Sequence, residues 1–424
     1  MVNLQSAGYA ASGIEYGARN VTTHFSADGP GYKNLTTSRG SNQSGVRAHN
    51  ERLVLSTVRR NGPLAKAEIA RMTGLSIQTS AVIVRSLEQE GLLTRGEPVR
   101  GRIGQPSVPM GLTPDGAFFL GLKIGRRSAD IVLLNFIGDV LESAHLVYDY
   151  PRLDEMMAFV LPAIAGMRTS VPQERLAGMG IAIPFRIWDW ARIAGAPAGQ
   201  MDEWRTRDIR AELEASLGLP VYLQNDASAA CGAELAFGKG PRPQDFLHFF
   251  IGYFIGGGLV LDNRLYTGRS GNAAALGSLP IAQTDGSYRQ LADTASLCLL
   301  ERALTRAGKS SESLWGPPDD WVVDDSILES WLEETCRSLA LAIIASCCVV
   351  DVETVLIDGW LPGHIRAEIV KRTAAILHET DAPGIEKPEV VEGTIGPNGR
   401  SLGAASLPLS DRYLVDLNAV LVAG

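Results

Sequence analysis

Two groups of side chains in this 424-residue sequence have the types and spacing needed for recognition chemistry. Gln78 and Arg85 lie on the segment SIQTSAVIVRSLEQEG; an amide can pair with an adenine edge, and a guanidinium can bind phosphate or guanine. Asn225 and Asp226 follow the apolar run LPVYLQ, and a carboxylate at a strand end can accept a hydrogen bond or a proton from a hydroxyl. The first group points to nucleic acid and the second to a small polar ligand.

A helix-turn-helix is the arrangement that would present Gln78 and Arg85. Apolar residues over 53–58 suit a first helix that Asn61-Gly62-Pro63 stops, and KAEIARM over 66–72 suits a second. After the turn 73–75, the Ser76 hydroxyl can cap a third helix that runs to Gly91 and is anchored by Ile83, Val84 and Leu87. The expected DNA contacts of this helix are Ser76, Ile77, Gln78, Thr79 and Arg85.

The segment TRGEPVRGRIGQPSV, which follows, predicts a basic hairpin wing with Arg95, Arg100 and Arg102 facing phosphates. A small helical unit can also serve protein contacts, and loop arginines can simply be solvated. Charge separation favours DNA: residues 46–106 hold ten Lys and Arg against five Asp and Glu, a net of +5, whereas residues 107–424 carry −14 and the whole chain −8.

Composition indicates a globular protein, because 45% of residues are hydrophobic and 20% are charged. The five cysteines are scattered without a CxxC pair, which predicts neither disulfides nor zinc and suits the cytoplasm. The run LALAIIASCCVV over 339–350 is too short to span a membrane and predicts a buried helix, so no membrane partner is expected. Residues 1–45 lack apolar periodicity and predict a disordered extension.

Beyond the wing, residues 118–141 read as a strand hairpin, and four later segments alternate apolar strand, glycine-rich turn and helix. This pattern predicts an α/β body with two lobes. We expect residues 46–112 to form the winged helix-turn-helix and residues 113–424 to form the body.

The ordered set of NGPLAKAEIARMTGLS, GRIGQPS, LPVYLQNDASAACGAELAFGKG, IGYFIGGGLVLDNRLYTGRSG and VETVLIDGWLPG with SLGAA resembles the transcriptional regulators of the ROK family. The resemblance spans about residues 46–407. It implies a two-lobed, actin-like ATPase fold behind the DNA-binding unit, with a cleft that binds sugars or sugar phosphates. The family also contains sugar kinases.

Departures from the kinase pattern favour a regulator over an enzyme. Lys123 stands where the family's kinases carry an aspartate that handles magnesium, and Ala275 and Ser278 replace two sugar-binding residues. Since phosphoryl transfer depends on metal charge, we expect no catalysis and no cofactor. Residues 278–296, which match the family's zinc loop, contain no Cys or His, so no metal is expected.

The resemblance makes Asn225 and Asp226 the expected ligand-binding residues. The alternative is that Asp226 only caps the helix beginning at Ala227. We therefore expect a repressor of carbohydrate-related genes that binds a double-stranded operator and a sugar-derived effector as a homodimer or homotetramer. A sugar kinase, and a DNA-bound regulator whose degenerate cleft binds no ligand, remain alternatives.

Overall fold

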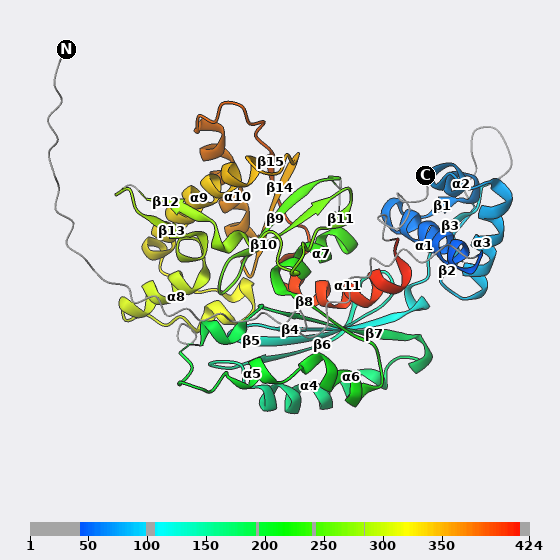
Figure 1. Cartoon of the computed structure of the whole chain (residues 1–424), viewed down its shortest axis with the longest axis horizontal. Helices are drawn as coiled ribbons and strands as arrows, with labels where there is room; N and C mark the ends of the chain where they lie inside the picture. The colour runs from blue at the N-terminus through cyan, green and yellow to red at the C-terminus, as the bar shows by residue number, and fades with distance from the viewer. Residues whose placement is uncertain (1–42, 99–106, 192–194, 240–242, 284, 416–424) are drawn as a thin grey trace, which may run out of the picture. The chain divides into compact units, whose positions relative to one another are not determined.

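The computed structural model describes residues 43–98, 107–191, 195–239, 243–283 and 285–415. It opens with three helices and a small sheet of order β1-β3-β2 (Figure 1). Helix α1 ends just before Gly62, whose φ of 78° takes the chain out of the helix, and Gly74 makes the turn between the next two helices. The bounds are α1 Gln43–Asn61, β1 Leu64–Ala65, α2 Lys66–Thr73, α3 Ile77–Gln89, β2 Leu93–Arg95 and β3 Pro109–Leu112.

The first lobe is built on a five-stranded sheet of order β6-β5-β4-β7-β8. Strands β4, β7 and β8 run parallel, and β5 and β6 are antiparallel to their neighbours. One face of the sheet packs on α4 and α6 through a continuous apolar core. The bounds are β4 Phe118–Ile124, β5 Ser128–Leu134, β6 Val140–Val147, α4 Leu153–Arg168, β7 Leu176–Ile183, α5 Glu203–Thr206, α6 Ile209–Leu217 and β8 Val221–Asn225.

The second lobe is built on a five-stranded sheet of order β11-β10-β9-β14-β15. Helices α8, α9 and α10 share its largest apolar core. The bounds are β9 Phe246–Ile251, β10 Gly256–Leu261, β11 Arg264–Leu265, β12 Pro280–Ala282, β13 Tyr288–Gln290, α8 Leu297–Arg306, α9 Asp325–Cys347, β14 Thr354–Gly359, α10 Gly363–Glu379 and β15 Glu389–Glu392.

Two helices lie between the sheets, α7 (Asp226–Phe237) and α11 (Gly399–Tyr413) (Figure 1). Helix α11 packs on β4 and β7, α7 packs on β9 and β10, and the two helices pack on each other. The approach is close enough to require glycine: a Cβ at Gly403 would lie 1.8 Å from the carbonyl oxygen of Ala229, and one at Gly180 would lie 1.8 Å from that of Ala404. This layering fixes the ends of α7 and α11 relative to both lobes.

The predicted α/β architecture is confirmed, with a helix-turn-helix followed by two sheet-based lobes. The apolar run at 339–350 is only partly the predicted buried helix: Leu339 and Ile343 are buried in α9, but the helix stops at Cys347 and Val349 is 84% exposed. Among the described residues, no helix is both long and apolar enough to cross a membrane. Short 3-10 helices complete the chain: η1 Pro114–Gly116, η2 Gln173–Arg175, η3 Ile187–Trp190, η4 Leu276–Ser278, η5 Leu291–Asp293, η6 Glu312–Trp315, η7 Pro318–Asp320 and η8 Gly396–Asn398.

Candidate functional site

Helix α3 begins at a hydrogen-bonded cap. The Ser76 hydroxyl accepts from the backbone N–H of Thr79 at 3.1 Å, and the two hydroxyl oxygens lie 2.8 Å apart. The predicted cap is therefore confirmed. It satisfies one of the amides that open the helix and fixes the direction in which the first turn of α3 leaves the domain.

The two faces of α3 differ sharply in burial. Ile83, Val84 and Leu87 are buried in the core of the helix-turn-helix, as predicted. On the opposite face Ile77 is 76% exposed and Val82 is 64% exposed. The side chains of Gln78 and Arg85 are also exposed, and neither side chain forms a hydrogen bond within the described part of the chain. Exposed apolar side chains can contact thymine methyls in a major groove. Amide and guanidinium groups on the same face can form hydrogen bonds with base edges.

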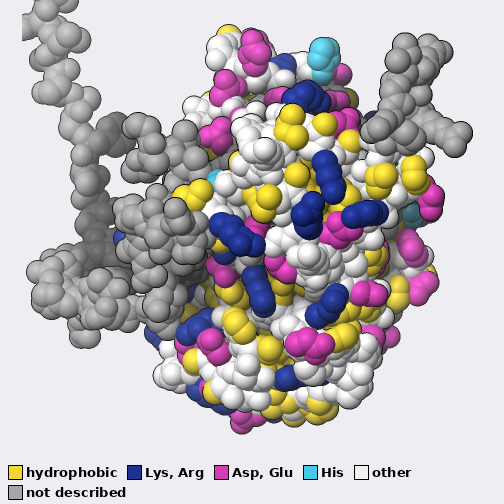
Figure 2. All heavy atoms as spheres, turned by 90° about the vertical axis from the view of Figure 1, so that its right-hand side faces the viewer, with side chains coloured by type: hydrophobic (Ala, Val, Ile, Leu, Met, Phe, Trp, Pro, Cys, Tyr) yellow, Lys and Arg dark blue, Asp and Glu magenta, His cyan; other side chains and the backbone are white. Residues whose placement is uncertain are grey.

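Charged side chains surround this exposed face. Figure 2, which views the side of the molecule carrying α1–α3, shows Lys and Arg side chains spread across its middle. Arg95 is exposed, and its Nε lies 2.6 Å from the Glu88 carboxylate, whose pKa this hydrogen bond lowers. Arg47 is a basic residue that the sequence reasoning passed over; it donates to Ser86 at 2.9 Å and to Glu51 at 2.8 Å. The spacing of four residues between Arg47 and Glu51, which suits an ion pair on one helix, is the sequence signal that could have identified Arg47.

The base of the predicted wing is present as an antiparallel pair. Strand β2 pairs with β3 from Leu93 opposite Leu112 to Arg95 opposite Met110, and the Gly96 N–H donates to the Pro109 carbonyl at 2.8 Å. Arg100 and Arg102 lie outside the described residues, as do residues 1–42 of the expected extension; residues 43–45, also assigned to that extension, instead belong to the start of α1. The roles assigned to Arg100 and Arg102 stay predictions.

The helix-turn-helix shares a core with the first lobe. Val54, Val58 and Leu87 belong to the same buried cluster as Phe119 and Phe136. The Arg59 guanidinium donates to the Phe136 carbonyl and stacks over the Phe136 and Phe237 rings at 5.2 and 5.8 Å. Further along, the Val415 N–H donates to the Ser56 hydroxyl at 3.0 Å. Helix α1 is thus held by α7, the β5–β6 turn and the segment after α11.

The second predicted site lies where β8 passes into α7. Asn225, not Asp226, caps this helix, because its side-chain oxygen accepts from the N–H groups of Ala227 and Ser228 at 3.1 and 3.3 Å. The Asp226 carboxylate instead faces Arg400, with an N–O distance of 3.3 Å. The alternative in which Asp226 only caps α7 is wrong. Both side chains are partly accessible.

The first glycine turn of the body, between β4 and β5, is occupied by a buried ion pair. Lys123 Nζ lies 2.8 Å from the Asp130 carboxylate and donates to the Ser128 hydroxyl at 2.6 Å. Burial acts to raise the pKa of Asp130, but Lys123 and a hydrogen bond from His145 outweigh it and hold that pKa well below its usual range. Asp130 was not identified from the sequence, although it is the cross-strand partner of Lys123. The carboxylate in this place is therefore bonded to Lys123, although burial lowers the pKa of the Lys123 amine.

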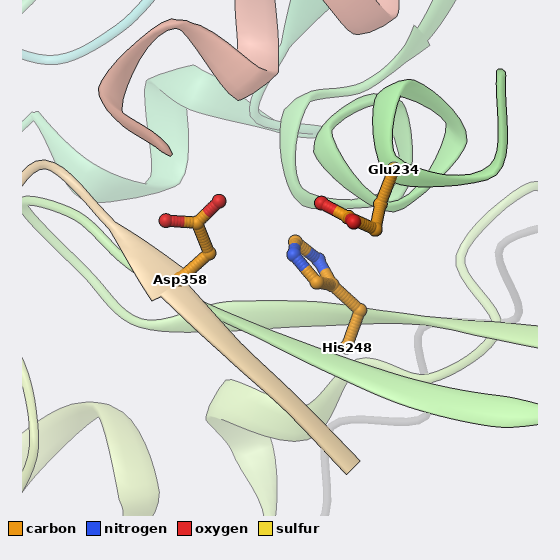
Figure 3. Close-up of side chains that lie close together, drawn as sticks. All are labelled: Glu234, His248 and Asp358. Carbon is orange, nitrogen blue, oxygen red and sulfur yellow. The ribbon is translucent and has the colours of Figure 1, made fainter. Parts of the chain in front are cut away.

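A third cluster was also missed from the sequence. Glu234, His248 and Asp358 are buried on α7, β9 and β14, and their ligand atoms lie within 4.8 Å of one another (Figure 3). Burial lowers the pKa of His248 to about 4, so its imidazole is neutral near pH 7.

Comparison with known proteins identifies both parts of the chain. Residues 119–299 match the family model described as ROK family, and residues 47–94 match the one described as winged helix-turn-helix DNA-binding. The chain combines a ROK domain with a winged helix-turn-helix. The ROK match runs from β4 into α8 and so includes both the Lys123 turn and Asn225-Asp226.

Individual relatives of this chain are distant in sequence. A xylose repressor of Bacillus subtilis is 24% identical over 245 residues, which are 57% of this chain and 62% of that repressor. The crystal structure of a ROK family transcriptional regulator, a homologue of the Escherichia coli MLC protein, superposes with a TM-score of 0.63 at 21% identity, covering 89% of this chain and 98% of that one. A ROK family glucokinase from Streptomyces griseus, in complex with glucose and AMPPNP, gives 0.52 at 20% identity over 69% and 99% of the two chains. These structures show the ROK fold.

Proposed function

We propose that this protein is a DNA-binding transcriptional regulator that represses carbohydrate-related genes and is modulated by a sugar or sugar-derived effector. The observation that carries the proposal is α3, whose one face is anchored in a core while the other offers Ile77, Gln78, Val82 and Arg85 to solvent. The name of the Bacillus subtilis relative, a xylose repressor, supports both the direction of control and the class of effector.

DNA recognition is assigned to the first turns of α3 and to the wing. Gln78 and Arg85 would contact base edges, Ser76 and Thr79 would approach the backbone, and Arg95 with the wing arginines Arg100 and Arg102 would bind phosphates. A homodimer or homotetramer would place two such units on half-sites about one helical turn apart. The helix-turn-helix over 46–112 would be the reader, and the ROK domain over 113–424 the effector-binding and oligomerising unit.

The effector is assigned to the start of α7. Asp226 keeps a carboxylate oxygen outside its contact with Arg400, and the Asn225 amide nitrogen is not used by the cap. An effector that binds one arrangement of the lobes more tightly would shift the population toward that arrangement and change the spacing of the DNA-binding units.

A sugar kinase is the competing function, because the fold is shared with the Streptomyces griseus glucokinase. Two contacts argue against it: Asp226 is paired with Arg400, and the carboxylate of the first glycine turn is paired with Lys123. We infer that the protein does not transfer phosphate. Sugar-dependent ATP turnover that Asp226→Asn abolishes would overturn this inference.

The regulator proposal is tested by selection of genomic DNA fragments with the purified protein at near-physiological salt, followed by sequencing. A shared motif with two-fold symmetry is expected, and no enrichment would refute the proposal. Gln78→Ala should lower the affinity for the selected site by roughly 5- to 150-fold, as for one base contact of about 1–3 kcal/mol, and relax the sequence preference. Gln89→Ala is the matched control, because Gln89 is exposed on the same helix about 16 Å further along.

A further inference from the structure

The cluster of Glu234, His248 and Asp358 brings two acids and an imidazole together inside the second lobe. Their relative exposures are 7%, 1% and 1%, and they come from α7, β9 and β14. In Figure 3 the His248 ring stands between the two carboxylates. Such a grouping in a lobe core needs a partner for each polar atom.

The two carboxylates are held as acceptors by fixed donors. Glu234 accepts from the N–H and hydroxyl of Thr394 at 2.9 and 2.6 Å and from the Ile395 N–H at 3.2 Å. Asp358 accepts from the N–H groups of Gly359 and Gly396 at 2.9 and 2.7 Å and from Arg366 at 3.1 Å. A carboxylate offers about four acceptor positions, so each has one left.

The imidazole is the unsatisfied member. Neither ring nitrogen of His248 has a hydrogen-bond partner within the described part of the chain, although both are buried. Leaving a polar atom buried without a partner destabilises the folded protein. A neutral imidazole has one lone pair to offer to a ligand.

We propose that Glu234, His248 and Asp358 bind one divalent transition-metal cation, of the zinc or manganese class. The ligand atoms lie within 4.8 Å of one another with no hydrogen bond from His248 to either acid, so the three groups are close enough to share one ion after a small inward shift. Ligands around a tetrahedral ion with bonds of about 2.0–2.1 Å are about 3.4 Å apart, so the cluster would contract by up to about 1.4 Å on binding. Two oxygens and one imidazole nitrogen suit this class of metal, and Ca²⁺ or Mg²⁺ would favour oxygens alone.

The charges of the cluster also fit a cation. The only described basic group in an ion pair with these acids is Arg366, which pairs with Asp358 and with Glu392 on β15. Glu234 forms no ion pair within the described residues. A bound dication would offset the charge of Glu234 and would turn the unpartnered imidazole into a ligand.

The position of the cluster gives the metal a structural consequence. Glu234 and Asp358 hold the turn from Thr394 to Gly396, which leads into α11. Helix α11 carries Arg400, the partner of Asp226. The metal would therefore fix the start of the helix that lies between the lobes.

The test is metal analysis of the full-length protein purified without chelator, on wild type, His248→Leu and His364→Gln. His364 is an exposed histidine on α10 and serves as the matched control. About one equivalent of zinc or manganese per chain is expected in the wild type and the control, and less than a tenth in His248→Leu. Bound metal that persists undiminished in His248→Leu would overturn the proposal.

A second measurement keeps the test decisive if the protein loses metal during purification. Chelator-treated wild type should gain several degrees in its melting midpoint when zinc or manganese is added, but not with magnesium, because an ion that binds only the native state stabilises it. His248→Leu should show no response to metal. It should melt no lower than metal-free wild type, since leucine removes two unsatisfied nitrogens. Absence of any response in the wild type refutes the site, and DNA selection is a separate readout that this result does not touch.

Discussion

Replacing Gly403 by alanine tests the close crossing of α7 and α11 on which both lobes depend. The added Cβ would lie 1.8 Å from the Ala229 carbonyl oxygen and 2.2 Å from its carbon, whereas real Cβ contacts are essentially never below 3.0 Å. The helices would have to separate by about 1.2 Å, which is the difference between the 3.0 Å limit and the 1.8 Å distance to the Ala229 oxygen. Both contacts are with backbone, so no side-chain rotation can relieve them.

The separation is opposed on the other side of α11. There Gly180 of β7 and Gly121 of β4 would place a Cβ only 1.8 and 2.3 Å from the Ala404 and Ser401 carbonyl oxygens, so the sheet already touches the helix backbone. Because α11 is confined between backbone on two sides, we expect the upper part of the usual overpacking cost, about 3 kcal/mol. Displacement of α11 should also disturb the Arg400–Asp226 contact.

Urea unfolding followed by fluorescence and circular dichroism measures this effect. Gly403→Ala should unfold at a clearly lower urea concentration than the wild type. Gly166→Ala is the matched control: Gly166 is on α4, a Cβ there meets nothing within 4 Å, and helix propensity predicts a gain of about 0.5–1 kcal/mol. If Gly403→Ala unfolds at the wild-type midpoint, the helix crossing described above is wrong.

Three further outcomes are expected. Ser76→Ala should cost about 1 kcal/mol by removing the cap of α3, seen as faster amide exchange at Thr79 and weaker DNA binding, and unchanged exchange would contradict the cap. Asn225→Ala should lower the unfolding midpoint by a similar free energy through the loss of two bonds to α7, whereas Asn225→Asp should retain most of it. Ellman's reagent should modify exposed Cys348 first in the native protein, and Cys348→Ser should remove that phase; buried Cys298, whose pKa burial raises to about 12, should react only after unfolding.

The helix-turn-helix could be predicted from sequence because its signals are local. The stop at Gly62-Pro63, the turn at Gly74 and the cap at Ser76 lie within 15 residues, and the 3.6-residue period of α3 separates its buried face from its exposed one. The strands and turns of the body could also be predicted from local sequence, because apolar runs alternate with glycines there.

The side-chain partners in the body could not be predicted in this way. Asp226 and Arg400 are 174 residues apart, and only the packing of α7 on α11 brings them together. Glu234, His248 and Asp358 each lie in a segment whose pattern indicates only a buried helix or strand. Lys123 with Asp130 is the exception, because the hairpin register that places them opposite each other follows from the length of a short turn.

The cluster that joins Val54, Val58 and Leu87 to Phe119 and Phe136 has a consequence for how the chain unfolds. Fragments cut between β3 and β4 would each leave part of one apolar interior open to water, so neither half should be fully stable or freely soluble alone. The DNA reader would then melt together with the first lobe as one cooperative unit. A movement of the first lobe would therefore be passed on to the helix-turn-helix through packed side chains.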